Sequence, residues 1–234
     1  VERTLSDPAV DLVFIGTPHY THADLSIRAA KARKHIFCEK PMGLNDDECE
    51  AVAKAVTKAG VTYAIGYNRT MSPFVLQASE LLGHLNAPAL VYHRMADWNP
   101  YSHGWLLDES LSGGRIIGEA GHGLDMICAL VGQEPIRVFA EGGNLAEPSP
   151  TGAPDSAIIT LGFPNGSCGT MFLSSVGNNG YPKEEVQITC ANHTIVINNF
   201  QHMEIHSPSG SQTFRLSSID KGHRNELDLL AQAI

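Results

Sequence analysis

The chain has 234 residues, of which 43% are hydrophobic and 18% are charged, and its formal net charge is −9 at pH 7. This composition is ordinary for a globular protein with a buried core. The acidic balance argues against a nucleic-acid or anionic-membrane partner, and no apolar run approaches the roughly 20 residues that a membrane-spanning helix needs.

The cysteines are widely separated and include no Cys-x-x-Cys pair; they are Cys38, Cys49, Cys128, Cys168 and Cys190. Such spacing favours unpaired thiols in a reducing compartment over a disulfide framework or a zinc site. We therefore expect a cytoplasmic protein whose cysteines serve as small buried apolar groups.

Residues 10–41 predict a parallel strand–helix–strand unit. Leu12–Ile15 form an unbroken apolar run, which predicts a parallel strand covered on both faces. The residues after Pro18 have helical spacing, with alanine and isoleucine on one face and basic residues, including Lys34, facing solvent. His35–Cys38 then predicts the next strand.

Polar groups follow the ends of three predicted strands. Thr17-Pro18 follows the first strand and Glu39-Lys40-Pro41 the second. A helix over 45–60 leads to a third strand over 61–65, which ends at Gly66-Tyr67-Asn68-Arg69. Because the carboxyl ends of parallel strands share one edge of a sheet, we expect these groups to form one ligand-binding rim.

The pattern changes in the rest of the chain. A helix, a strand, an aromatic loop and a second helix are predicted at 72–85, 89–95, 98–105 and 115–131. Short alternating runs then follow at 137–141, 156–161, 168–173, 185–190, 194–197, 202–206 and 212–216. Such alternation predicts antiparallel strands with one buried and one free face. A last helix over 221–234 is expected to pack through Leu227, Leu230 and Ala231.

Three groups of residues occur in a particular order: Asp11-x-Val13-x-Ile15-x-Thr17-Pro18 followed by His22, then His35-x-x-x-Glu39-Lys40-Pro41, then Gly66-Tyr67-Asn68-Arg69. In order and spacing they resemble the Gfo/Idh/MocA family of NAD(P)-dependent sugar and polyol dehydrogenases. The resemblance implies an α/β Rossmann-like parallel-sheet domain, N-terminally incomplete, over residues 1–70. It further implies an α+β domain over 71–234 with a large, mostly antiparallel sheet, through which homodimers or homotetramers would form.

The sequence contains no G-x-G-x-x-G turn and no G-x-x-x-x-G-K-[S/T] phosphate loop. The resemblance places residues 10–17 at about the fourth strand of a dinucleotide fold. We therefore expect the glycine-rich turn, and the residue that selects NAD or NADP, to lie upstream of Val1.

Lys40 is the first candidate catalytic residue. A lysine at a strand end beside a nicotinamide can hydrogen-bond a substrate hydroxyl and share in proton transfer. The resemblance implies that Lys40 contacts substrate and cofactor, and that Glu39 helps to position the nicotinamide. The alternative is a surface lysine before a proline turn.

His122 is the second candidate catalytic residue. It lies in residues 113–125, which resemble the family's GGxxxDxxxH segment, whose histidine is the usual general acid/base. Imidazole suits this role because its pKa lies near neutrality. The family aspartate is replaced by Gly118, so we expect Glu119 or Asp125, each three residues from His122, to take its place. Otherwise the chemistry is altered or lost, or His122 is a structural helix residue.

The remaining candidates are contacts for cofactor or substrate. The expected cofactor contacts are Thr17, Pro18, His22, Glu39, Lys40 and Asn68, although His22 could instead cap and pack its helix. The expected substrate contacts are Arg69, Trp98, Tyr101 and Asp125. Stacking on a sugar ring suits the cluster of Trp98, Tyr101, His103 and Trp105, although an aromatic loop can equally form a lid or core plug. His202 and His206 share a strand face without a third ligand, so no metal site is expected.

The resemblance therefore implies an oxidoreductase that moves hydride between a secondary hydroxyl or keto group of a sugar, sugar derivative or cyclic polyol and NAD or NADP. One alternative is an NAD-retaining glycosidase that oxidises its substrate transiently, eliminates and reduces back. The other is a regulatory protein that binds NAD(P) or sugar without turnover, which the Gly118 departure supports.

Overall fold

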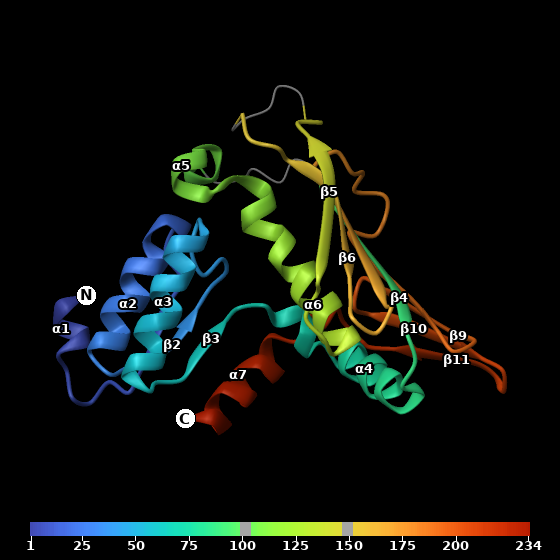
Figure 1. Ribbon diagram of the computed structural model, residues 1–234, viewed down its shortest axis with the longest axis horizontal. Helices are drawn as coiled ribbons and strands as arrows, with labels where there is room; N and C mark the ends of the chain where they lie inside the picture. Colours follow the sequence, from blue (N-terminus) through green and yellow to red (C-terminus); the bar gives the residue numbers. More distant parts are fainter. Residues whose placement is uncertain (99–103, 147–151) are drawn as a thin grey trace.

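The computed structural model describes residues 1–98, 104–146 and 152–234. Its strands form a three-stranded sheet in the order β1-β2-β3 and an eight-stranded sheet in the order β11-β10-β9-β8-β4-β7-β6-β5. Figure 1 shows the small sheet with its helices on one side of the molecule and the large sheet on the other. The predicted combination of a parallel α/β sheet and a large, mostly antiparallel sheet is confirmed.

The small sheet is parallel throughout. Its strands are β1 (Leu12–Ile15), β2 (His35–Cys38) and β3 (Tyr63–Ile65), and its helices are α1 (Glu2–Leu5), η1 (His19–Thr21), α2 (His22–Lys31) and α3 (Asp46–Ala59). The α3 helix begins where the Asn45 side chain accepts a hydrogen bond from the Glu48 amide, and it ends at Gly60, whose φ is 66°. These local signals fix the length of α3 and so the entry into β3.

Two details of this half differ from the prediction. Phe14 is 59% exposed, because α2 packs against Val13 and Ile15 on one face of β1 while Phe14 points to the other. Lys34 is buried rather than solvated, and its Nζ donates to the carbonyl oxygen of Asp7 at 2.8 Å. The amine caps the turn before β1, which the charge pattern of the helix did not indicate.

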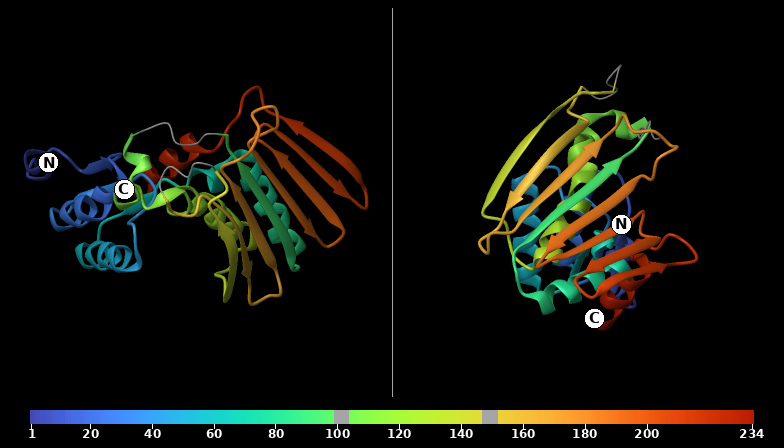
Figure 2. Two further views of the ribbon diagram at one scale, coloured as in Figure 1. Left: turned by 90° about the horizontal axis from the view of Figure 1, so that it is seen from above. Right: turned by 90° about the vertical axis from the view of Figure 1, so that its right-hand side faces the viewer.

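The large sheet consists of β4 (Ala89–Ala96), β5 (Arg137–Gly143), β6 (Ser156–Gly162), β7 (Cys168–Ser174), β8 (Glu184–Cys190), β9 (His193–Asn198), β10 (His202–Ser207) and β11 (Gly210–Arg215). All neighbouring strands are antiparallel except β4 and β7, which are parallel. Burial alternates along β4 and β8, as predicted. Figure 2 shows helices behind one face of the sheet and the other face open.

The buried face of the large sheet packs against α4 (Pro73–Leu85) and α6 (Gly121–Val131). Between the two sheets lie η2 (Asn68–Met71), η3 (Gly104–Leu107), α5 (Glu109–Ser112) and a π-helical turn, η4 (Ile116–Ala120), that leads directly into α6. The last helix, α7 (His223–Ala233), buries Leu230 but leaves Leu227 and Ala231 exposed, so two of its three predicted packing positions are wrong. Only one side of α7 faces the rest of the molecule.

No helix among the described residues combines the length and apolar character needed to cross a membrane.

Candidate active site

The ends of β1 and β2 are tied together by His22. Its Nδ1 lies 2.7 Å from the Pro41 carbonyl oxygen and its Nε2 lies 2.8 Å from the Thr17 carbonyl oxygen. The side chain is completely buried. His22 therefore holds the two predicted cofactor loops at a fixed separation, and its expected contact with the cofactor stays a prediction.

Lys40 reaches from the end of β2 to the π-helical turn η4. Its Nζ donates to the Gly118 carbonyl oxygen and to Oε1 of Glu119, both at 2.8 Å. Burial acts to raise the pKa of the Glu119 carboxyl, but the Lys40 ammonium outweighs it and holds that pKa at about 2. Two predicted catalytic residues thus form an ion pair that joins the two halves of the molecule.

His122 lies one helical turn beyond Gly118, between two glycines that permit close packing. A Cβ atom at Gly121 would lie 2.6 Å from the Tyr67 hydroxyl oxygen, and one at Gly123 would lie 2.5 Å from Nδ1 of His93. The Tyr67 and His122 rings meet edge to face with centroids 5.8 Å apart. The Gly-His-Gly sequence therefore lets α6 approach the end of β3 and strand β4.

The imidazole of His122 is neutral. Burial, reinforced by the charge of Arg69, lowers its pKa to about 2. Among the described residues, Nδ1 of His122 has no hydrogen-bond partner. The charge of Lys40 also lowers this pKa, and the carboxylates of Glu119 and Glu184 oppose the shift without reversing it.

A cavity of about 170 Å³ lies beside Lys40; its lining includes His19, Trp105, Arg115, Gly118 and Glu119. His122 is not among the lining residues. Sequence reasoning missed His19, although it directly follows Thr17-Pro18 at the end of β1. Its ring is placed by contacts with residues about one hundred positions later, for which the sequence gives no local signal.

Asp125 lies away from this cavity. Its carboxylate accepts a hydrogen bond from the Thr70 hydroxyl at 2.5 Å, and burial raises its pKa. It lines a separate cavity of about 540 Å³ between β3 and α7, together with Tyr67 and Glu226. Glu119 and Asp125 were expected to orient His122, but Glu119 bonds Lys40, Asp125 bonds Thr70, and Nδ1 of His122 has no partner among the described residues. The substrate role of Asp125 stays a prediction.

Arg69 belongs to a buried ion-pair network. Its Nε and Nη2 donate to the two carboxylate oxygens of Glu184 at 2.6 and 2.9 Å, and Nζ of Lys221 donates to the same carboxylate at 2.5 Å. The neighbouring Asn68 donates its side-chain amide to the Lys221 carbonyl oxygen. These bonds fix the end of β3 to β8 and to the start of α7, and the predicted ligand contacts of Asn68 and Arg69 remain untested.

The aromatic candidates differ in their positions. Trp105 lines the cavity beside Lys40, and His103 lies outside the described residues. Trp98 is 63% exposed and forms an isolated bridge with Val176. Tyr101 lies outside the described residues. Thr17, at the end of β1, and Glu39, at the end of β2, are exposed. Pro18 is half-buried and directly precedes η1. Within residues 1–98, 104–146 and 152–234, no group of three His, Cys, Asp or Glu side chains is arranged to hold a metal ion.

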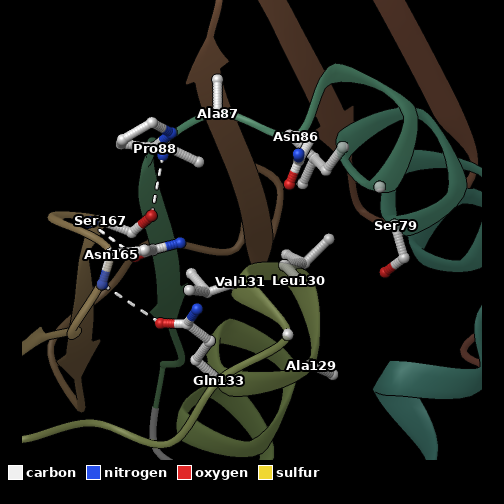
Figure 3. A pocket seen from close by; sticks show the side chains of 14 residues that line it. Ser79, Asn86, Ala87, Pro88, Ala129, Leu130, Val131, Gln133, Asn165 and Ser167 are labelled. Carbon is white, nitrogen blue, oxygen red and sulfur yellow. Dashed lines mark hydrogen bonds between the residues drawn. The ribbon is translucent and has the colours of Figure 1, made fainter.

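A further cavity, of about 340 Å³, lies where α4 and α6 end against the turn between β6 and β7 (Figure 3). In that turn the Ser167 hydroxyl accepts from the Ala89 amide, and the Gln133 side chain accepts from the Asn165 amide. None of its 14 lining residues is titratable. This cavity lacks acid/base groups. We take the region around Lys40, Glu119 and His122 as the candidate active site because it brings together the predicted catalytic residues.

Comparison with known proteins identifies the family of this chain. The model of the oxidoreductase family with an NAD-binding Rossmann fold matches residues 1–67, and the GFO/IDH/MocA C-terminal domain model matches residues 77–196. The chain therefore belongs to the Gfo/Idh/MocA oxidoreductase family.

Among its relatives, 2,7-anhydro-N-acetylneuraminate hydratase of Escherichia coli is 32% identical over 203 residues, which cover 84% of this chain and 54% of the relative. Myo-inositol 2-dehydrogenase of Thermotoga maritima is 31% identical over 181 residues, which cover 76% of this chain and 53% of the relative. The chain thus spans about half the length of these curated relatives. The solved structure of levoglucosan dehydrogenase with NADH and levoglucosan has a TM-score of 0.81 at 24% identity, covering 95% of this chain and 65% of that one.

Proposed function

We propose that this chain is part of an NAD(P)-dependent oxidoreductase that transfers hydride between a secondary hydroxyl or keto group of a sugar, sugar derivative or cyclic polyol and nicotinamide. The observation that carries the proposal is the Lys40–Glu119 ion pair, which joins the end of a parallel strand to the turn that leads into His122. In this proposal residues 1–70 bind the dinucleotide, and residues 71–234 bind substrate and associate with other subunits.

The ends of β1 and β2 suit the nicotinamide end of a dinucleotide, because ligands of parallel sheets bind at this edge. Thr17, Pro18 and Glu39 would border the cofactor there, with His22 and Asn68 fixing the loops from behind. When bound, NAD(P) supplies the hydride acceptor or donor.

The chain's own part in the reaction is orientation and proton transfer. Lys40, held by Glu119, would donate a hydrogen bond to the substrate oxygen and so favour its negative charge as the proton leaves. The imidazole of His122 would accept the hydroxyl proton when the same carbon loses its hydride, and would return it in the reverse reaction. His122 does not line the cavity beside Lys40, so this role requires the substrate to extend from that cavity to the ring. It also requires that bound substrate and cofactor raise the pKa of His122 from about 2 towards the neutral value expected from the sequence. A general base of this kind contributes about 10²- to 10⁴-fold in rate.

A second candidate is a transient-redox reaction with no net consumption of the cofactor, as in the NAD-retaining glycosidase considered above. The similarity to a relative named as a hydratase supports it, because adding water to a sugar involves no net oxidation. A binding protein without turnover is the third candidate, and it draws its support from Gly118.

Association of subunits would use the open face of the large sheet. The exposed side chains of Leu90 on β4 and Ile158 on β6 lie on this face and provide apolar surface for a second copy of the chain. We expect a dimer or tetramer, and light scattering of Leu90→Lys should report a smaller species if this face is used.

The test uses the protein in its full natural length with NAD or NADP and a panel of inositols and sugars. Net formation of reduced nicotinamide that falls at least 100-fold in His122→Ala supports the dehydrogenase, with the exposed His84→Ala as control. Product formation without net reduction indicates the transient-redox reaction. Turnover that His122→Ala leaves unchanged would overturn the catalytic assignment.

A further inference from the structure

The cavity beside Lys40 contains a second histidine, His19, to which the proposed function gives no role. His19 is the first residue of η1, directly after the loop that ends β1. It lines the same cavity as Lys40 and Glu119. Its position within that cavity raises the question of what its ring can bind.

One bond fixes the tautomer of the His19 ring. Nδ1 lies 2.7 Å from the carbonyl oxygen of Ser112, and a carbonyl oxygen can only accept. Nδ1 therefore carries the proton, which leaves Nε2 as a lone-pair acceptor. No described residue forms a hydrogen bond with Nε2.

Packing fixes the orientation of the ring. The Trp105 ring meets it edge to face with centroids 4.7 Å apart. On another side, a Cβ atom at Gly118 would come within 3.2 Å of Cε1 of His19, closer than carbon atoms normally pack. Glycine at position 118 thus provides the room that the imidazole occupies.

The surroundings of His19 favour its neutral form. Burial lowers the pKa of the ring, and the charges of Lys40 and His22 act in the same direction. The Ser112 carbonyl and the Glu119 carboxylate oppose this shift without reversing it. At neutral pH, Nε2 is consequently an acceptor and not a donor.

Lys40 supplies the complementary group. An ammonium has three N–H donors, and two of those of Lys40 are taken by the Gly118 carbonyl and the Glu119 carboxylate. One donor is left for a ligand. The cavity therefore offers one free donor and one free acceptor on neighbouring side chains.

We propose that His19 is a substrate-binding residue whose Nε2 accepts a hydrogen bond from one hydroxyl of a polyol, while Lys40 donates to a second oxygen of the same molecule. This assignment rests on the proposed function, because it takes the cavity beside Lys40 as the substrate site. It limits the substrate to molecules with at least two hydroxyl or carbonyl groups close together.

Two substitutions of similar size distinguish a role of His19 in substrate binding from a purely structural role. His19→Asn keeps a donor for the Ser112 carbonyl but has no group at the position of Nε2, whereas His19→Gln can place an amide oxygen there. We expect His19→Asn to raise the KM for the polyol about threefold to tenfold, the value of one hydrogen bond, and His19→Gln to recover part of this loss. The Kd for the nicotinamide cofactor should not change.

Gly118→Ala tests the same ring from the other side. The added Cβ should displace His19 and raise the KM for the polyol, whereas Gly83→Ala on α4, where a Cβ meets no atom within 4 Å, should leave KM unchanged. In the wild type, KM should also rise as pH falls through the pKa of His19, because a protonated Nε2 repels a hydroxyl proton. His19→Asn should lose this dependence.

Binding of the polyol measured by calorimetry separates this proposal from the proposed function. A polyol that binds the wild type, but binds His19→Asn more weakly, supports His19 even if no hydride is transferred. Normal turnover with an unchanged KM in His19→Asn overturns the role of His19 and leaves the oxidoreductase proposal standing. Failure of every polyol to bind overturns both.

Discussion

The Nζ atom of Lys40 lies 2.8 Å from Oε1 of Glu119. This ion pair joins the end of β2 in the small sheet to the turn η4, which leads into α6, the helix that packs on the large sheet. This pair orients the amine whose third donor is free for substrate. In the family pattern an aspartate stands at position 118 and is expected to orient the histidine. Here the neighbouring Glu119 pairs with Lys40, and Nδ1 of His122 has no hydrogen-bond partner among the described residues.

Glu119→Gln should lower kcat/KM about 10- to 100-fold, because a hydrogen bond to a charged partner is lost and Lys40 is no longer held. Steady-state kinetics with the polyol as variable substrate would measure the loss. In a Lys40→Met background the same substitution should cost little, since the two residues act together. Equal losses in both backgrounds would contradict this coupling.

The buried, neutral His122 should make stability depend on pH. In the folded protein its pKa is lowered to about 2 from an ordinary value of 6.5, so below pH 6.5 the unfolded chain binds more protons at this site. The free energy of unfolding should therefore decrease as the pH is lowered below 6.5, by up to about 1.4 kcal/mol per pH unit. At pH 5, the contribution lost is about 2 kcal/mol.

Urea unfolding of wild type and His122→Gln between pH 5 and 7.5 would measure this contribution. The free energy of unfolding should depend on pH more steeply in the wild type than in the variant. Substitution of the exposed His84 by glutamine should leave the wild-type slope intact. Parallel curves for wild type and His122→Gln would show that the pKa of the imidazole is the same in the folded and unfolded protein.

Glu184→Gln should destabilise the protein by about 3–5 kcal/mol, because Arg69 and Lys221 would lose the carboxylate that neutralises them in a buried site. Denaturant unfolding gives the free energy directly. The adjacent Glu185→Gln, on the outer face of β8, should change it by less than about 0.5 kcal/mol. A small effect at Glu184 would mean that water reaches the network.

His22→Ala should weaken cofactor binding and lower the free energy of unfolding by about 2–4 kcal/mol, since it removes two buried hydrogen bonds and leaves a cavity. Calorimetry with the nicotinamide cofactor and thermal unfolding would report the two effects separately. Loss of stability with unchanged cofactor affinity would restrict His22 to a packing role.

Much of the fold follows from local patterns. The apolar runs at β1 and β2, the Asn45 cap and Gly60 end of α3, and the alternation along β4 and β8 are all encoded within short stretches. The coverage of Phe14 was predicted wrongly because an apolar run does not reveal how many helices pack on it. The burial of Lys34 depends on a carbonyl far back in the chain.

The site was only partly predictable for the same reason. Motif order indicates Lys40 and His122 as candidates, and the spacing to His122 indicates Glu119. The contact between Lys40 and Glu119 joins segments that are distant in sequence. The role of His19 depends on Ser112 and Gly118, and the pairing of Arg69 depends on Glu184. No periodicity within η1 or η2 carries information about those partners.

The parallel pairing of β4 with β7 has a consequence for how the chain folds as it is made. Strand β4 lies between β7 and β8, both of which follow it at a long distance in sequence. The centre of the large sheet therefore cannot form until β8 has left the ribosome, whereas β1, β2 and β3 pair with near neighbours. Until β8 has been synthesised, the apolar side of α4 stays exposed to solvent. We expect the need for chaperones to be greatest during this interval.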